Sequence, residues 1–173
     1  YESSHLLIPL SINGYANEDV IVKTLIVLKE QTPCLDTKVV RPYMSETEIT
    51  DSDKDRINAI LNRIQDAHDR IAIKEDKASK AIAKKVYTQT HLLSLIKVTE
   101  KSINIGISES DFVGFIESFF NSENGASVNI SYNECCSDGS GHAPSVATRL
   151  EELENNFNTY FKNYPDKNGF FGK

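Results

Sequence analysis

The segment 50–71 carries the feature that most constrains the fold, which is a helical repeat of apolar residues. Thr50 is a favourable N-cap residue, and the acids Asp51 and Asp53 follow in the first turn, where they favour the positive end of a helix dipole. Apolar side chains then recur every three or four positions, at Ile57, Ile60, Leu61, Ile64, Ala67 and Ile71. This spacing predicts an amphipathic α-helix whose apolar face must be buried against other elements.

Similar patterns predict further helices at residues 18–31, 74–85, 90–103, 108–120 and 146–163. Two stretches between them, 33–48 and 121–144, are rich in turn residues or interrupted by proline, and we interpret both as long loops. Within the second, residues 128–132 alternate apolar and polar side chains, which predicts a short extended segment. The expected fold class is all-α: a bundle of five or six helices in a single helical domain over residues 1–173.

The composition of the chain argues against a membrane-spanning or secreted protein. The net charge is −6, and no apolar run approaches the roughly 20 residues that a membrane span needs. The three cysteines offer no disulfide pattern, and no secretory signal is visible, so we expect a cytoplasmic protein without a membrane partner. Because the sequence starts with Tyr1, we interpret it as part of a longer protein.

Two clusters resemble metal sites, but neither has the required spacing. The acidic run 51–55 opens like a calcium loop, yet Arg56 stands where the loop needs glycine and Asn62 where it needs glutamate. The adjacent cysteines 135–136 and His142 do not match the spacing of zinc ligands. The four histidines are scattered, and nucleophile and nucleotide-loop motifs are missing. We therefore predict no metal, no cofactor and no complete catalytic constellation in this chain.

A basic strip is the first candidate binding site. If the helix continues through Ile73, five basic residues fall within about 80° of one another on its surface: Arg63, Arg70, Lys74, Lys77 and Lys84. Such a strip predicts contact with the phosphate backbone of DNA. The alternative is a solvated helix face, partly neutralised by acids nearby: Asp66, Asp69, Glu75 and Asp76.

The second candidate lies in the stretch 136–150, where a Gly/Ser loop leads into a helix. Helix starts bind anions through N–H groups that lack intrahelical acceptors. The predicted phosphate-binding residues are Ser140, Gly141, His142 and Arg149. The alternative is that the stretch is only a connector.

The order of these segments resembles one family. The resemblance rests on five sequence segments: ITDSD at 49–53, RINAIL at 56–61, AIAKKVYTQTHLLSL from Ala81, SESDF at 108–112 and VATRL at 146–150. Together they resemble the helical C-terminal half of the ParB/sulfiredoxin-like, DGQQR-motif nucleotidases, the GmrS-type half of modification-dependent restriction systems. The resemblance covers residues 45–155. The DGQQR segment and a His-Asn-His nuclease motif are absent, so only the loop and Arg149 are carried over.

The resemblance implies a helical domain of an intracellular anti-phage protein that restricts modified DNA. Such a domain would support DNA or nucleotide recognition beside a catalytic domain or partner protein, without a complete active site of its own. The alternative is a protein–protein interaction module, based on a wide aromatic face of which one or two residues would be exposed: Phe112, Phe115, Ile116, Phe119 and Phe120. A third hypothesis is an active site shared with a missing domain, in which the loop and Arg149 hold a phosphate.

Overall fold

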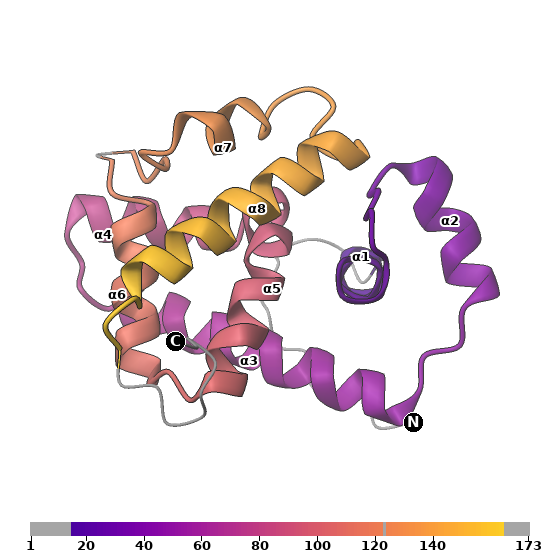
Figure 1. Cartoon of the computed structure of the whole chain (residues 1–173), viewed down its shortest axis with the longest axis horizontal. Helices are drawn as coiled ribbons and strands as arrows, with labels where there is room; N and C mark the ends of the chain where they lie inside the picture. The colour runs from indigo at the N-terminus through magenta and orange to yellow at the C-terminus, as the bar shows by residue number, and fades with distance from the viewer. Residues whose placement is uncertain (1–14, 123, 165–173) are drawn as a thin grey trace.

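The computed structural model describes residues 15–122 and 124–164, and these residues contain helices but no β-strand. Eight helices follow one another in this part of the chain (Figure 1): α1 Tyr15–Lys29, α2 Thr37–Glu46, α3 Asp51–Ala72, α4 Lys77–Val86, α5 Gln89–Ile105, α6 Glu109–Phe119, α7 Ile130–Glu134 and α8 Ala143–Tyr160. The expectation of an all-α fold is confirmed. None of the helices described is long and apolar enough to span a membrane.

Helix α5 lies at the centre of the packing. It contacts α1, α3, α4 and α8, and α8 crosses in front of it in Figure 1. Buried side chains occur on all sides of α5, including the polar residues His91, Ser94 and Thr99. Because side chains on nearly every face of α5 are buried, other elements surround this helix.

The six predicted helices are present as α1, α3, α4, α5, α6 and α8, with ends that differ by a few residues. The start of α3 follows the prediction closely. Thr50 Oγ1 accepts a hydrogen bond from the N–H of Asp53, and the Asp53 carboxylate accepts one from the N–H of Thr50, which forms a capping box. The apolar face from Ile57 to Ile71 is buried as its spacing predicts.

Two predicted irregular segments are helical, so the count of five or six helices is too low. Within 33–48, α2 forms although it contains Pro42, which removes one backbone donor from a short helix. Burial of Val40 where α2 packs on α1 compensates for that loss. The predicted extended segment 128–132 is also wrong, because the side chain of Asn129 caps α7 by accepting from the N–H of Tyr132.

The aromatic face of α6 is entirely buried, which contradicts the expectation that one or two of its residues are exposed. Phe115 contacts Phe157 and Phe161 at the end of α8, and Phe119 contacts Tyr132 of α7. The face is wide because α3, α7 and α8 all cover parts of it. The aromatic residues of α6 therefore form core and leave no surface for a partner.

Candidate functional site

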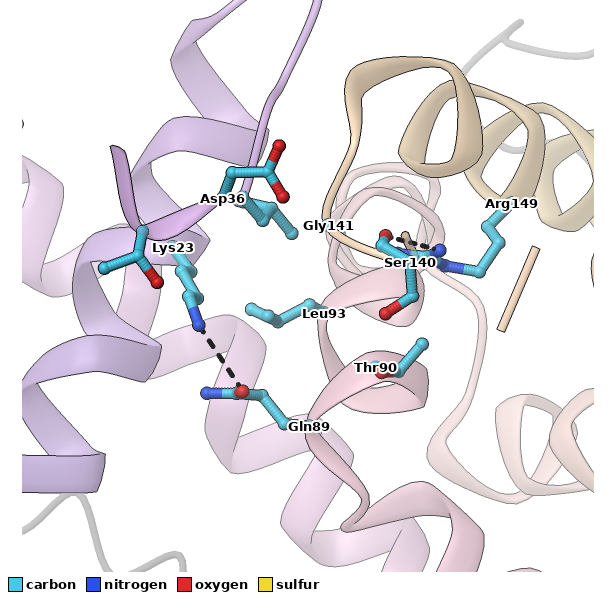
Figure 2. A pocket seen from close by; sticks show the side chains of 10 residues that line it. Lys23, Asp36, Gln89, Thr90, Leu93, Ser140, Gly141 and Arg149 are labelled. Atoms are coloured by element: carbon cyan, nitrogen blue, oxygen red, sulfur yellow. Dashed lines mark hydrogen bonds between the residues drawn. The ribbon is translucent and has the colours of Figure 1, made fainter. Parts of the chain in front are cut away.

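A cleft of about 220 Å³ lies where α1, the start of α2, the start of α5, and α8 with its preceding loop meet. Figure 2 shows Lys23 and Gln89 on one side of the cleft, and Ser140 and Arg149 on the other. Its walls come from five separate segments of the chain: Lys23, Leu35, Asp36, Thr37, Gln89, Thr90, Leu93, Ser140, Gly141 and Arg149. Most of these side chains are polar.

One backbone hydrogen bond joins two of the segments that form the cleft. The N–H of Leu35 donates to the carbonyl oxygen of Gly141 at 2.8 Å, which joins the α1–α2 connection to the loop before α8. A Cβ atom on residue 141 would lie 2.8 Å from Asp36 Oδ1 and 3.3 Å from the backbone of Leu35. Glycine at this position therefore permits a close approach of two segments.

Arg149 forms the inner wall and is only 2 % exposed. Its Nε donates to Ser94 Oγ at 2.9 Å, and its Nη1 donates to the carbonyl oxygens of Ser140, at 2.8 Å, and Cys135. All of these acceptors are neutral, and no carboxylate of the residues described lies within ion-pair distance of the guanidinium. Burial lowers the pKa of Arg149. Buried charges are ordinarily paired, so this one leaves positive charge uncompensated at the cleft wall.

The helix starts around the cleft differ from those elsewhere in the described part of the chain. Side chains cap the starts of α3, α4, α6 and α7, through Thr50, Asp76, Ser108 and Asn129. No side-chain cap hydrogen bond forms at the starts of α2, α5 and α8, whose N-cap residues are Asp36, Thr88 and His142. Two of these helices begin in the cleft lining, α2 with Thr37 and α5 with Gln89, whereas the first residues of α8 lie outside it. The first N–H groups and the dipoles of α2 and α5 add positive potential there.

On the opposite wall, the side chains of Lys23, Gln89 and Asp19 contact one another. Lys23 Nζ lies 2.7 Å from a carboxylate oxygen of Asp19 and donates to Gln89 Oε1 at 3.4 Å. Gln89 Nε2 donates to the same Asp19 carboxylate at 2.8 Å. The carboxylate of Asp36 also lies in the cleft, with Nε2 of His142 3.6 Å away. The cleft thus offers donors on both sides and one acceptor at its rim.

Behind Arg149, a buried hydrogen bond joins α5 to α7. His91 Nδ1 lies 2.7 Å from the hydroxyl oxygen of Tyr132, and both side chains are buried. Burial lowers the pKa of His91 to about 4, helped by the charges of Lys85 and Arg149. Burial also raises the pKa of Tyr132. The network holds the short helix α7, and with it the Cys135 carbonyl that accepts from Arg149.

The structure brings together three of the four predicted phosphate-binding residues, Ser140, Gly141 and Arg149. The fourth, His142, lies outside the lining, with 65 % of its side chain exposed. Sequence reasoning missed the other cleft residues, including Lys23 and Asp36. No local pattern could have identified these, because Lys23 and Asp36 lie 117 and 104 residues before Ser140, and the α5 residues of the lining lie 47–51 residues before it.

The basic strip predicted over residues 63–84 does not form one continuous helix face. Helix α3 ends at Ala72, and α4 begins at Lys77 after a turn in which Glu75 has a φ of 61°. The prediction required the helix to run through Ile73, and this condition is not met. The left-handed conformation of Glu75 redirects the chain between the two helices.

The basic residues before this turn make contacts within the molecule. Arg63 Nη1 donates to Ser102 Oγ at 3.1 Å and to the carbonyl oxygen of Ile107 at 2.8 Å. Arg70 and Lys74 form ion pairs with three carboxylates, those of Asp66, Glu109 and Glu117. The two strip residues after the turn are exposed on α4: Lys77 and Lys84.

Comparison with known proteins adds no further constraint on the cleft. No protein-family model, curated protein or solved structure matches this chain. Among the residues described, no group of three or more histidine, cysteine, aspartate or glutamate side chains could hold a metal ion.

Proposed function

We propose that this chain is a helical binding domain whose cleft holds a phosphate-bearing ligand of the nucleotide class. The observation that carries the proposal is the guanidinium of Arg149, which is buried without a carboxylate partner in the described residues and lines the cleft. An anion in the cleft would compensate this charge. It would also accept hydrogen bonds from the uncapped start of α5, where Gln89 and Thr90 line the cleft.

The other wall residues favour a ligand with hydroxyl groups next to its anionic group. The carboxylate of Asp36 would repel a second anion but accepts hydrogen bonds from sugar hydroxyls. A volume of about 220 Å³ is below the roughly 300 Å³ from which pockets for whole ligands start. The cleft therefore suits a sugar phosphate, and a base would extend beyond it.

This function agrees with the role that the resemblance to the DGQQR-motif nucleotidases implies. The chain would recognise a nucleotide or a DNA end beside a catalytic domain of a restriction protein and would contribute binding rather than chemistry. The interaction module based on the aromatic face of α6 has lost its supporting feature, because that face is core.

Thermal unfolding in the presence of ribose 5-phosphate tests the proposal. At a ligand concentration of 100 times Kd the stabilisation is about 2.7 kcal/mol, which corresponds to a rise in Tm of about 5–10 °C for a chain of this size. Lys23→Gln removes one charged donor and should weaken binding about tenfold. Lys97→Gln, an exposed lysine of α5 away from the cleft, is the matched control and should leave binding unchanged.

A second variant separates the two parts of the ligand. Asp36→Asn should weaken binding of ribose 5-phosphate, because the hydroxyl acceptor is lost. It should strengthen binding of inorganic phosphate, because the negative charge is removed from the cleft. If neither probe shifts Tm of the wild-type protein, or if Lys23→Gln and Lys97→Gln behave alike, the cleft is not the site.

A further inference from the structure

The helix α4 carries four lysines in ten residues, which we call the α4 lysine face: Lys77, Lys80, Lys84 and Lys85. Within residues 15–122 and 124–164, no carboxylate forms an ion pair with any of them. Three of the four nearby acids named above, all except Glu75, are engaged elsewhere. Asp66 pairs with Arg70, Asp69 contacts His68, and Asp76 caps α4 through the N–H and hydroxyl of Ser79.

The positions of these lysines concentrate their charge. At 100° and 1.5 Å per residue, the four side chains leave the helix within a sector of about 140° and along a row about 12 Å long. Three of them are exposed and Lys85 is half-buried. The chain as a whole carries a net charge of −6, so the α4 lysine face is a positively charged patch on a negatively charged protein.

A groove of about 480 Å³ runs beside the α4 lysine face. Its lining combines lysines with Ala81, Thr88 and Asn124. The wall opposite α4 is fixed, because Gly125 has a φ of 76° and a Cβ atom there would lie 2.6 Å from the carbonyl oxygen of Ala81. The side-chain amide of Asn124 is a neutral donor of the kind that contacts phosphate oxygens in protein–DNA complexes, whereas the Thr88 hydroxyl donates to the carbonyl oxygen of Lys84.

We infer that the α4 lysine face and its groove bind the phosphate backbone of duplex DNA without reading its sequence. A duplex carries one negative charge per about 1.7 Å of its axis, so a lysine row of this length meets several phosphates at once. No aromatic ring lines the groove, and a surface that binds single strands would use rings to stack bases. The site is separate from the cleft, which involves no residue of α4.

Fluorescence anisotropy of the whole chain with a labelled 20-base-pair duplex of mixed sequence tests the inference. With about four phosphate contacts, binding should weaken on the order of 100-fold between 50 and 200 mM KCl. The double substitution Lys77→Glu and Lys84→Glu should weaken binding at 50 mM KCl at least tenfold. It should also lower the slope of log K against log salt by about 2.

The matched control carries the same change of net charge on other exposed lysines, Lys38→Glu and Lys97→Glu. It should change Kd by less than threefold. Circular dichroism checks that both pairs remain helical, and Lys77→Gln with Lys84→Gln repeats the test with a smaller charge change.

Three results would overturn the inference: no binding of the wild-type chain at 50 mM KCl, an equal loss in the control pair, or an unchanged salt slope in the α4 pair. A fourth is binding to vesicles with 30 % phosphatidylserine in place of the duplex, which would assign the face to a membrane surface. The Lys77→Glu and Lys84→Glu protein should keep its rise in Tm with ribose 5-phosphate, because no residue of α4 lines the cleft. Failure of this inference and failure of the cleft proposal therefore give different results.

Discussion

The contact between α3 and α6 and the cleft between α1, α5 and α8 both contain charged side chains and helix starts, but their electrostatics differ. At the first, Arg70 pairs with Asp66 and Glu109, Lys74 pairs with Glu117, and both helices begin at side-chain caps. At the cleft, Arg149 has only neutral acceptors among the residues described, and the helix starts have no side-chain caps.

This difference separates groups that serve the fold from groups that remain available to a ligand. In the α3–α6 contact each local requirement is met by a neighbour, so no additional group is needed there. In the cleft, one buried charge and the starts of α2 and α5 lack such neighbours. Real proteins depart from local consistency mainly at functional sites, which is why we place the ligand in the cleft.

The largest expected effect is that of replacing Arg149. Arg149→Leu leaves the carbonyl oxygens of Cys135 and Ser140 without a donor, at about 1–3 kcal/mol each, and should lower the free energy of unfolding by about 2–6 kcal/mol. Arg70→Leu, in the exposed α3–α6 contact, should leave it nearly unchanged. Urea unfolding at pH 7 measures both variants. Equal losses would show that the two regions do not differ in the way that we describe.

Lowering the pH should destabilise the two regions over different pH ranges, through His91 near the cleft and Asp53 of α3. The pKa of His91 is about 4 in the folded chain, below its ordinary 6.5, so the unfolded chain gains a proton first as the pH falls. Stability is therefore complete above pH 6.5 and falls by about 3 kcal/mol as the pH drops to 4. Urea midpoints at pH 7, 5.5 and 4 measure this loss, which His91→Gln should abolish.

Asp53 of α3 provides the comparison, because its hydrogen bonds with Lys29 and Thr50 lower its pKa to about 2. A carboxyl group with a lowered pKa stabilises the fold above its ordinary pKa of 3.8, and that contribution is lost as the pH falls toward 2. Asp53→Asn should thus change the pH dependence only below pH 4. A loss between pH 6.5 and 4 that persists in His91→Gln would contradict the assignment to His91.

The smallest effect compares a capped helix start with an uncapped one. Thr50→Ala removes the cap of α3 and should lower the free energy of unfolding by about 1 kcal/mol. Thr88→Ala, at the uncapped start of α5, should change it by less than half as much, because the Thr88 side chain caps no N–H group. Thermal unfolding of the two variants in the same buffer measures the difference. A larger loss from Thr88→Ala would mean that α5 is capped after all.

Sequence reasoning succeeded where structure depends on neighbours in the chain. The repeat from Ile57 to Ile71 and the cap at Thr50 identified α3, because both signals lie within one segment. It missed α2, since Pro42 was interpreted as a helix breaker, whereas the burial of Val40 outweighs one lost hydrogen bond. That burial depends on α1 and is invisible locally.

The same limit applied to the candidate sites. Ser140, Gly141 and Arg149 were identified together because a loop and the following helix bring them close. Lys23 and Asp36 join them only through the packing of distant helices. The continuous helix that the basic strip required is absent, because α3 ends at Ala72 and Glu75, in the turn that follows, has a positive φ.

The hydrogen bond between the N–H of Leu35 and the carbonyl of Gly141 has a kinetic consequence. It joins segments that are distant in the chain, and such contacts form late because closing a long loop is entropically unfavourable. We therefore expect the cleft to be absent from the transition state for folding. A bound sugar phosphate should slow unfolding and leave the folding rate unchanged, so that the ligand lengthens the lifetime of the folded state without changing how fast that state forms.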